Sequence, residues 1–228
     1  GLVYLIPTYQ NPVGTSLPLS ARERVIALAA ANPDVIFIDD MTLADVILSD
    51  SAPPPPLAEL APDLPNIVTI GSVSKTHWAG LRTGWIRAPE GIVAGLAAAK
   101  SAADLGSTAY QQAVVAALIA GQHDQIIKWR AEWLRPRYAA IDSALRAHLP
   151  AWTWTRPEGG LTIWARLPGD SDSEAFAQAA LRRGIAVVPG RLLSVADDAT
   201  DATNYVRIAY TQPPDQLAAA IETLAGIA

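Results

Sequence analysis

Two short apolar runs separated by one helix-length segment constrain the fold of this chain more than any other feature. Val3–Ile6 and Val35–Ile38 are continuous apolar runs, which is typical of strands buried on both faces. The segment between them predicts a helix over Ser20–Ala31, with Ser20 as its N-cap and Glu23 completing a capping box. Strand, helix and strand at this spacing form a βαβ unit, so we expect a mostly parallel sheet.

The alternation of apolar runs and alanine-rich stretches continues along the chain. Further strands are expected at Ile67–Ile70, Trp85–Arg87, Trp152–Thr155, Leu161–Arg166, Ala186–Val188 and Tyr205–Tyr210. Further helices are expected at Glu90–Ala103, Thr108–Ala120, Asp124–Leu149 (with a kink or junction at Pro136), Ser173–Arg183 and Pro214–Ile227. We therefore predict an α/β fold, with a large domain over 1–122 and an interdomain helix plus a small α+β domain over 123–228.

Composition excludes several classes of protein. The chain has 228 residues, of which 50% are hydrophobic and 17% charged, so wholesale disorder is excluded. A net charge of −5 leaves no global basic footprint for nucleic acid. The absence of cysteine excludes disulfides and cysteine-based zinc sites, and the three histidines (His77, His123 and His148) show no metal-ligand spacing. No apolar run reaches the roughly 18–20 residues of a membrane helix.

Polar segments follow two of the predicted strands, at the edge where open α/β sheets bind ligands. The loop Pro7–Gly14 carries Asn11, whose amide is both a donor and an acceptor. Asp39 and Asp40 end the second strand, and side-chain alternation lets only one of them point at a ligand. Taken alone, the first segment is more typical of an ordinary Asn-Pro turn. Helix capping of the following segment is the expected role of one of the two aspartates.

The segment Gly71–Trp85 carries the strongest chemical signal. Lys75 is one of only three lysines and follows an apolar strand directly. We expect it to be partly buried with a lowered pKa, as Schiff-base chemistry requires. Ser72, Ser74 and Arg82 could together hold a phosphate group. Ser-x-Ser-Lys alone is a weak motif, but the whole run, with arginine seven residues after the lysine, is far more specific.

A fourth candidate is Arg207, which lies inside the apolar strand Tyr205–Tyr210. An arginine flanked by apolar neighbours on a strand typically pairs with a carboxylate. That carboxylate could belong to the protein or to a ligand, and Arg207 by itself does not distinguish the two.

Together these segments resemble the class I/II, fold-type I aminotransferases, which use pyridoxal 5′-phosphate (PLP), over nearly all 228 residues. The resemblance implies that Asn11 bonds the PLP phenolic oxygen and that Lys75 forms the internal aldimine. It also places Ser72 and Arg82 at the phosphate and Arg207 at the α-carboxylate of the substrate. The runs Pro157–Gly160 and Gly184–Gly190 are similar to the small domain of this family.

The resemblance leaves two carboxylates as the pyridine partner. The pattern Asp40-x-Thr42-x-x-Asp45 favours Asp40, which we predict, whereas the spacing from Asn11 slightly favours Asp39. With Asp40 in that role, Leu43 replaces a tyrosine that the family often has three residues later.

A narrower resemblance links the chain to the MocR-type branch of GntR transcription regulators. It rests on the run Ser74–Trp85, on Asp104–Ser107 followed by Gln112, and on the Asp40–Asp45 pattern. The resemblance implies a PLP-binding effector domain that senses an amino acid or amine and binds DNA only through a winged-helix domain absent from this chain. It further implies a cytoplasmic homodimer with no membrane contact.

Two other functions remain open. The alternative is a free-standing aminotransferase acting on an amino acid. A scaffold that binds no cofactor is disfavoured because random drift would rarely retain Asn11, Asp40, Lys75 and Arg82 together.

The beginning of the chain, Gly1–Ile6, enters a strand at once, and we expect it to be a piece of a longer protein, cut inside a fold. The family's phosphate-binding turn and stacking aromatic precede the Asn11 loop and are absent here. We therefore expect apolar surface to be exposed at Val3–Ile6 and Val35–Ile38, and PLP binding by the isolated chain to be poor.

Overall fold

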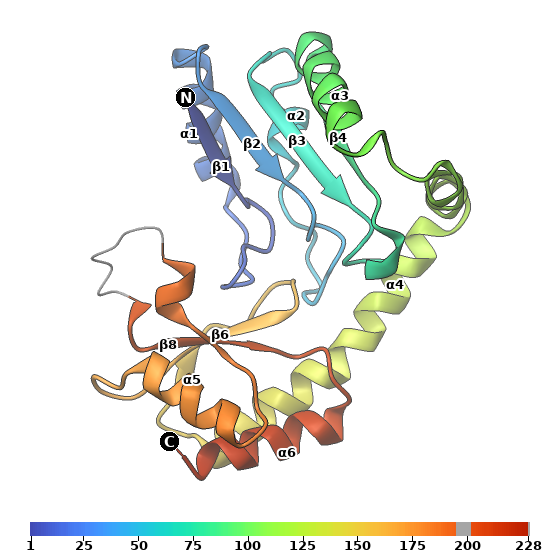
Figure 1. Ribbon diagram of the computed structural model, residues 1–228. Helices are drawn as coiled ribbons and strands as arrows, with labels where there is room; N and C mark the ends of the chain where they lie inside the picture. The colour runs from blue at the N-terminus through green and yellow to red at the C-terminus, as the bar shows by residue number, and fades with distance from the viewer. Residues whose placement is uncertain (195–201, 228) are drawn as a thin grey trace. The chain divides into compact units, whose positions relative to one another are not determined.

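The computed structural model describes residues 1–194 and 202–227, which form two compact units (Figure 1). Unit 1 comprises Gly1–Gln10, Thr15–Arg130 and Glu158–Gly160, and unit 2 comprises Asn11–Gly14, Ala131–Pro157 and Leu161–Ala228. The units divide within the long helix α4 (Ala109–His148), the helix that also contains the predicted domain boundary at 122/123.

Unit 1 is built on a four-stranded sheet in the order β1-β2-β3-β4. Its strands are β1 (Leu2–Leu5), β2 (Ile36–Asp40), β3 (Ile67–Ser72) and β4 (Gly84–Arg87). The first two pairings are parallel and the third is antiparallel. The helix α1 (Leu19–Ala31) connects β1 to β2, which confirms the predicted βαβ unit and the mostly parallel sheet.

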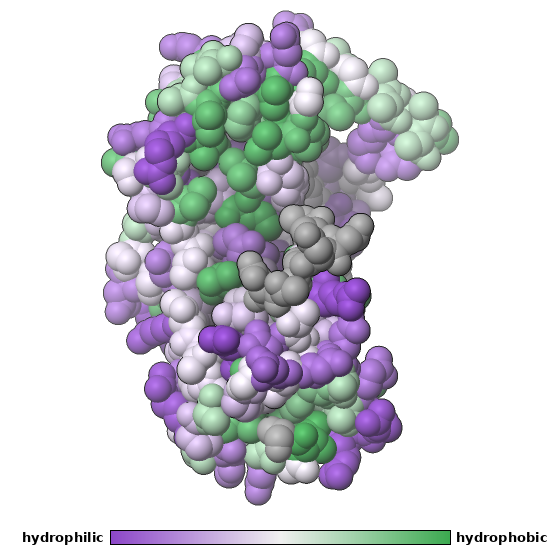
Figure 2. All heavy atoms as spheres, turned by 90° about the vertical axis from the view of Figure 1, so that its left-hand side faces the viewer, coloured by the Kyte–Doolittle hydropathy of each residue, from purple (hydrophilic) through white to green (hydrophobic). Residues whose placement is uncertain are grey.

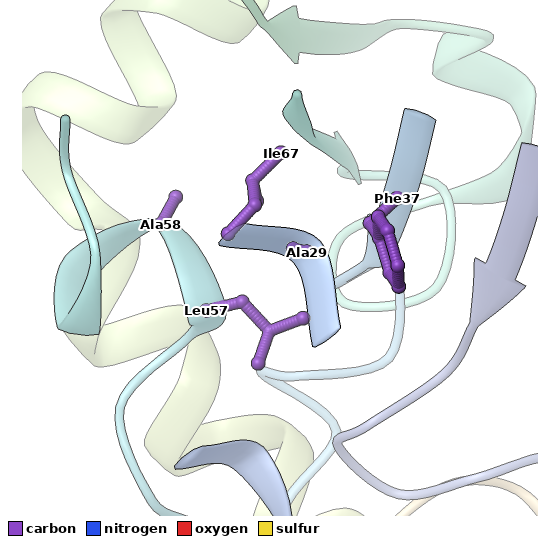
Figure 3. Close-up of a cluster of buried hydrophobic side chains, with 5 residues drawn as sticks. All are labelled: Ala29, Phe37, Leu57, Ala58 and Ile67. Atoms are coloured by element: carbon purple, nitrogen blue, oxygen red, sulfur yellow. The ribbon is translucent and has the colours of Figure 1, made fainter. Parts of the chain in front are cut away.

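A compact apolar cluster covers one face of this sheet (Figure 3). It joins side chains of α1, of the short helix α2 (Leu57–Leu60) and of strands β2 and β3, namely Ala29, Phe37, Leu57, Ala58 and Ile67. Because side chains alternate along a strand, Asp39 lies on the same face of β2 as Phe37, and Asp40 lies on the opposite face.

The opposite face of β1 is exposed. Leu2 and Tyr4 are 63% and 51% exposed, so the expectation that β1 is buried on both faces is wrong for the described chain, because no described element covers that face. Exposed apolar surface was expected at Val3–Ile6 and at Val35–Ile38. The prediction is confirmed at Tyr4 of β1, but it is wrong for Val35–Ile38, where no side chain is exposed. Figure 2 shows apolar side chains gathered over the part of the molecule where β1 and α1 lie. The helix α3 (Glu90–Asp104) likewise has no buried residue.

Two helix predictions are corrected. Helix α1 begins at Leu19 after an extended Pro18, so Ser20 lies inside the first turn and does not cap the helix through its side chain. Residues 109–148 form one helix instead of two, with Pro136 inside it. A proline removes a single backbone donor, and burial of Leu134, Tyr138, Ile141 and Leu145 compensates for that loss.

Unit 2 contains a second four-stranded sheet, in the order β5-β6-β8-β7, with every pairing antiparallel. Its strands are β5 (Thr153–Trp154), β6 (Thr162–Arg166), β7 (Val188–Pro189) and β8 (Tyr205–Ala209), and its helices are α5 (Ser173–Arg182) and α6 (Pro214–Ala225). The side chains Ile163, Ala165, Val206 and Ile208 are buried, and the alternate positions Trp164 and Arg207 point to the other face. None of the helices in the described part of the chain combines the length and apolar composition that a membrane span needs.

Candidate functional site

The predicted site residues fall into two groups, one in each unit. Unit 1 holds Asp40, Ser72, Ser74, Lys75 and Arg82, and unit 2 holds Asn11 and Arg207. Each group is described within its own unit.

In unit 1, the acidic end of β2 and the lysine segment share one edge of the sheet. Asp40 is paired with Ile70 on the parallel strand β3, and the Met41 amide donates to the Ile70 carbonyl at 2.9 Å. Ser72 ends β3 two residues later. Because both strands run in the same direction, Asp40 and Ser72 lie at the carboxyl edge where such sheets bind ligands.

The loop between β3 and β4 presents the hydroxyls and cations. Ser72 Oγ accepts a hydrogen bond from the Ser74 amide at 3.1 Å and donates to the Thr83 carbonyl at 3.3 Å, which ties the two ends of the loop together. Arg82 follows the 3₁₀ helix η1 (Ala79–Leu81) in a left-handed conformation, with φ of 48°. Its side chain is exposed.

Lys75 is exposed in unit 1, so the prediction that it is partly buried is wrong for the described chain. The reason is its place in a turn beyond the end of β3, where no described element covers its side chain. Its backbone is nevertheless held firmly, because Arg130 of α4 donates to the Lys75 carbonyl from Nε at 3.2 Å and from Nη2 at 2.6 Å. No sequence pattern pointed to Arg130.

Asp40 is 6% exposed and both of its oxygens accept hydrogen bonds. Tyr4 Oη donates to Oδ2, and the Thr42 amide donates to Oδ1 at 2.8 Å. Burial, together with the hydrogen bond to Asp40, raises the pKa of Tyr4 to about 12, so its phenol keeps the proton that it donates. Tyr4 was missed at the sequence level, although adjacent parallel strands make such a contact possible.

Asp39 occupies a different environment on the helix-covered face. It is fully buried, and the Leu57 amide donates to Oδ2 at 2.9 Å, while Oδ1 has no partner among the described residues. Burial raises the pKa of Asp39, whereas the Leu57 amide and the positive charge of Arg22 oppose that rise.

Arg22 is a buried cation that the sequence did not single out. Its guanidinium donates to the carbonyls of Leu17, Pro55 and Pro7 at 3.1, 3.1 and 2.7 Å, and to Thr8 Oγ1 at 2.8 Å. These bonds satisfy a fully buried charge and fix the chain where it leaves β1. Arg22 therefore supports the start of the loop that leads to Asn11.

Unit 2 brings its two predicted residues together. Arg207 Nη1 donates to Asn11 Oδ1 at 3.2 Å, although 196 positions separate the two residues in sequence. Thr162 Oγ1 donates to the Pro12 carbonyl at 3.1 Å, so the loop is also tied to β6. Since Asn11 Oδ1 accepts from Arg207, the Asn11 amide NH₂ stays available as a donor.

Gly159, from the run Pro157–Gly160, packs within unit 1 against Tyr9 of the loop Pro7–Gly14. A Cβ at Gly159 would lie 2.5 Å from the ring of Tyr9 and 2.5 Å from the Val46 carbonyl, so only glycine fits. Tyr9 is itself 1% exposed, with a left-handed φ of 52°. Close packing against Tyr9 and Val46 therefore requires glycine at this position.

A further group of titratable side chains was not foreseen. The three histidines are scattered in the sequence, but the rings of His77 and His123 stack on each other in the structure. His123 also faces Asp45. No group of three or more histidine, aspartate or glutamate side chains in the described ranges has a geometry suited to a metal ion.

The donor set of unit 1 fits PLP. It provides a buried carboxylate for a pyridine nitrogen, hydroxyls and a guanidinium for a phosphate, and a primary amine for an aldehyde.

Comparison with known proteins agrees with this chemistry. The family profile described as aminotransferase class I and II matches residues 3–224. An aromatic-amino-acid aminotransferase of Thermococcus litoralis is 30% identical over 94% of this chain and 51% of its own length. An HTH-type transcriptional regulator of Bacillus subtilis, YdfD, is 29% identical over 92% of this chain and 42% of its own length.

The fold is also that of solved aminotransferases. The α-aminoadipate aminotransferase LysN of Thermus thermophilus, solved with a phosphopyridoxyl-leucine compound, superposes with a TM-score of 0.90 at 27% identity. The match covers 99% of this chain and 58% of LysN. The chain thus spans about half the length of the curated relatives it matches.

Proposed function

Because this chain belongs to the class I and II aminotransferase family, whose cofactor is PLP, we propose that it is the PLP-binding effector domain of a GntR/MocR-type transcription regulator. One observation supports the proposal: Lys75 lies in the loop that follows β3 and also carries Ser74 and Arg82, at the sheet edge where the paired strand β2 ends in Asp39 and Asp40. The regulator assignment is supported by the similarity to an HTH-type regulator and by the Asp104–Ser107 and Asp40–Asp45 patterns.

The proposal extends to the rest of the protein. DNA binding would belong to a winged-helix domain outside this chain, and the ligand of the effector domain would be an amino acid or amine. We also propose that the protein is a cytoplasmic homodimer.

When bound, PLP supplies an aldehyde and an electron-withdrawing ring. We assign Lys75 Nζ as the attachment point and, once an incoming amine has replaced it, as the base that moves a proton at the substrate Cα. Ser72, Ser74 and Arg82 would bind the phosphate. Asn11 would donate its amide to the phenolic oxygen, and Arg207 would orient a substrate carboxylate.

Asp40 is the proposed partner of the pyridine nitrogen. It lies on the face of β2 opposite α1 and α2, whereas Asp39 points into the face covered by these helices. Asp40→Asn should weaken PLP binding by roughly 10- to 100-fold, the scale of a charge-assisted hydrogen bond. Asp39→Asn is the matched control and should bind PLP normally. The reverse pattern, measured by absorbance titration, would assign the role to Asp39.

The alternative function is a genuine aminotransferase acting on an amino acid. It is favoured by the 30% identity to an aromatic-amino-acid aminotransferase. A regulator needs only the exchange of Lys75 for an incoming amine, whereas a transaminase must also release a keto acid.

The two functions are separated with the intact protein loaded with PLP. A panel of amino acids is supplied with 2-oxoglutarate, and keto-acid formation and operator DNA binding are both measured. The regulator predicts that an amine changes DNA binding without catalytic keto-acid production. Sustained turnover with no effect on DNA would establish the alternative instead.

We further propose that the 228-residue chain alone binds PLP poorly. It supplies the carboxylate, the lysine and part of a phosphate site, whereas its relatives are about twice as long. A PLP titration of this chain and of the intact protein measures the difference, and equal affinities would mean that the residues of this chain suffice.

A further inference from the structure

Three titratable side chains from separate segments meet in unit 1. Asp45 follows β2, His77 lies between β3 and η1, and His123 lies on α4. The two imidazole rings stack with centroids 5.5 Å apart and an interplanar angle of 13°. His123 Nε2 lies 3.6 Å from Asp45 Oδ2, which is an ion-pair distance but too long for a hydrogen bond.

The environment of His77 favours its neutral form. Both of its ring nitrogens are buried and have no hydrogen-bond partner among the described residues. Burial lowers the pKa of His77, and the neighbouring His123 and Arg130 on α4 lower it further, while Asp45 opposes them. Burial in turn raises the pKa of Asp45, whereas the positive charges of His123 and His77 lower it.

The same face of α4 also binds the backbone of Lys75 through hydrogen bonds. Arg130 lies two helical turns after His123, and its guanidinium donates both hydrogen bonds to the Lys75 carbonyl. On the loop itself, the His77 amide donates to the Val73 carbonyl at 2.8 Å, which closes a turn around Lys75. Segment 73–77 is therefore attached to α4 at two points, the ring stack and the guanidinium.

We propose that His77 is a positioning residue for Lys75: its neutral ring, stacked on His123, holds segment 73–77 against α4, and its protonation loosens that hold. The inference rests on the proposed role of Lys75. A proton on His77 adds a cation beside His123 and Arg130, and Asp45 is the single carboxylate that acts on the ring among the described residues. Repulsion at ring-stacking distance and a buried unpaired charge both disfavour the attached arrangement.

The first test measures the segment in the intact protein without cofactor. Imidazole signals in NMR spectra, assigned with His77→Phe and His123→Phe, give the protonation of each ring. Hydrogen exchange of the amide of residue 77, which donates to the Val73 carbonyl, corrected for intrinsic rates, should lose roughly tenfold in protection between about pH 7.5 and about pH 5. His77→Phe keeps a flat ring that cannot be protonated, so its protection should not change over this range.

Two further variants sharpen this test. His77→Arg carries a permanent charge and should lack the protection at both pH values, and His77→Gln serves as the uncharged variant if His77→Phe fails to fold. His148→Gln changes an exposed histidine of unit 2 and should follow the wild-type protein. Protection that is independent of pH in the wild type, or a loss that persists in His77→Phe, would overturn the proposal.

The second test adds PLP and follows the rate of its attachment to Lys75 against pH. Wild-type protein should lose rate on the acidic side with the protonation of His77, and His77→Phe should lack that component while keeping the rate near neutral pH. Absence of attachment at any pH would refute the role of Lys75 and leave the exchange result standing. Normal attachment with identical pH profiles in both proteins would refute the role of His77 alone.

Discussion

The two units of the chain differ in how completely they bury their own sheets. Unit 2 buries side chains of its sheet and of two helices completely. Examples are Ile163, Val206, Ile141 and Leu224. In unit 1, one sheet face is closed by α1 and α2, but Leu2 and Tyr4 are exposed on β1 and α3 buries nothing. The sheet of unit 2 therefore has a well-buried core, whereas unit 1 leaves apolar side chains of its first strand exposed.

This difference bears on function because the loop that carries Lys75 belongs to unit 1, whose sheet is less completely buried. Lys75 and Arg82 are exposed, whereas the Asn11–Arg207 pair lies in the unit with the closed core. Unit 2 can hold its site residues with its own packing, whereas the site in unit 1 depends on local ties such as those from Arg130 and Tyr4.

The largest expected effect comes from a matched pair of core and surface truncations. Ile163→Ala should lower the free energy of unfolding of unit 2 by about 3–4 kcal/mol, because Ile163 is fully buried. Leu96→Ala on α3 should change stability by less than about 0.5 kcal/mol, since Leu96 is 43% exposed. Urea unfolding measures both, and similar losses at the two positions would contradict the comparison.

A smaller effect is expected from the polar cluster that anchors α4 to β5 in unit 2. Asp142 accepts hydrogen bonds from Tyr138 Oη at 3.1 Å, from Trp154 Nε1 at 3.0 Å and from Arg146 Nε at 2.9 Å. Asp142→Ala should therefore cost about 2 kcal/mol of unfolding free energy. Asp124→Ala, at an exposed position of α4 in unit 1, is the control and should be nearly neutral.

The same cluster predicts a pH dependence. Burial alone raises the pKa of Asp142, but hydrogen bonds from Arg146, Trp154 and Tyr138 outweigh it and lower the pKa. The stabilisation is present above the unfolded-state pKa of about 4 and is lost as the pH falls through the lower folded-state value. The stability difference between wild type and Asp142→Ala should shrink in acid, and a constant difference would contradict this account.

The smallest effect distinguishes the helix starts of the two units. Asp172 caps α5 by accepting hydrogen bonds from the Glu174 and Ala175 amides, so Asp172→Ala should cost about 1 kcal/mol. Ser20 does not cap α1, so Ser20→Ala should cost less than about 0.5 kcal/mol. Thermal unfolding of both variants checks the pair, and an equal loss would restore Ser20 as a cap.

The features predicted correctly from the sequence are those that depend on local hydrophobic pattern. Apolar runs gave the strands, and their spacing gave the parallel sheet and the edge that carries Asp40 and Lys75. It could not predict that β1 keeps an exposed face, because periodicity does not report which elements are present to cover a strand. It also could not join Asp45, His77 and His123, since contacts between distant segments are set by the packing of α4 and not by spacing.

The central claim is that Lys75 is the attachment point for PLP. The direct measurement treats the intact protein with PLP, reduces it with borohydride and maps the modified lysine by peptide mass. The account predicts modification at Lys75, its loss in Lys75→Ala with the fold retained, and no modification of Lys100, which is paired with Asp104 at 2.7 Å on α3. Modification of Lys100 or Lys128 in place of Lys75, or no modification at all, would contradict it.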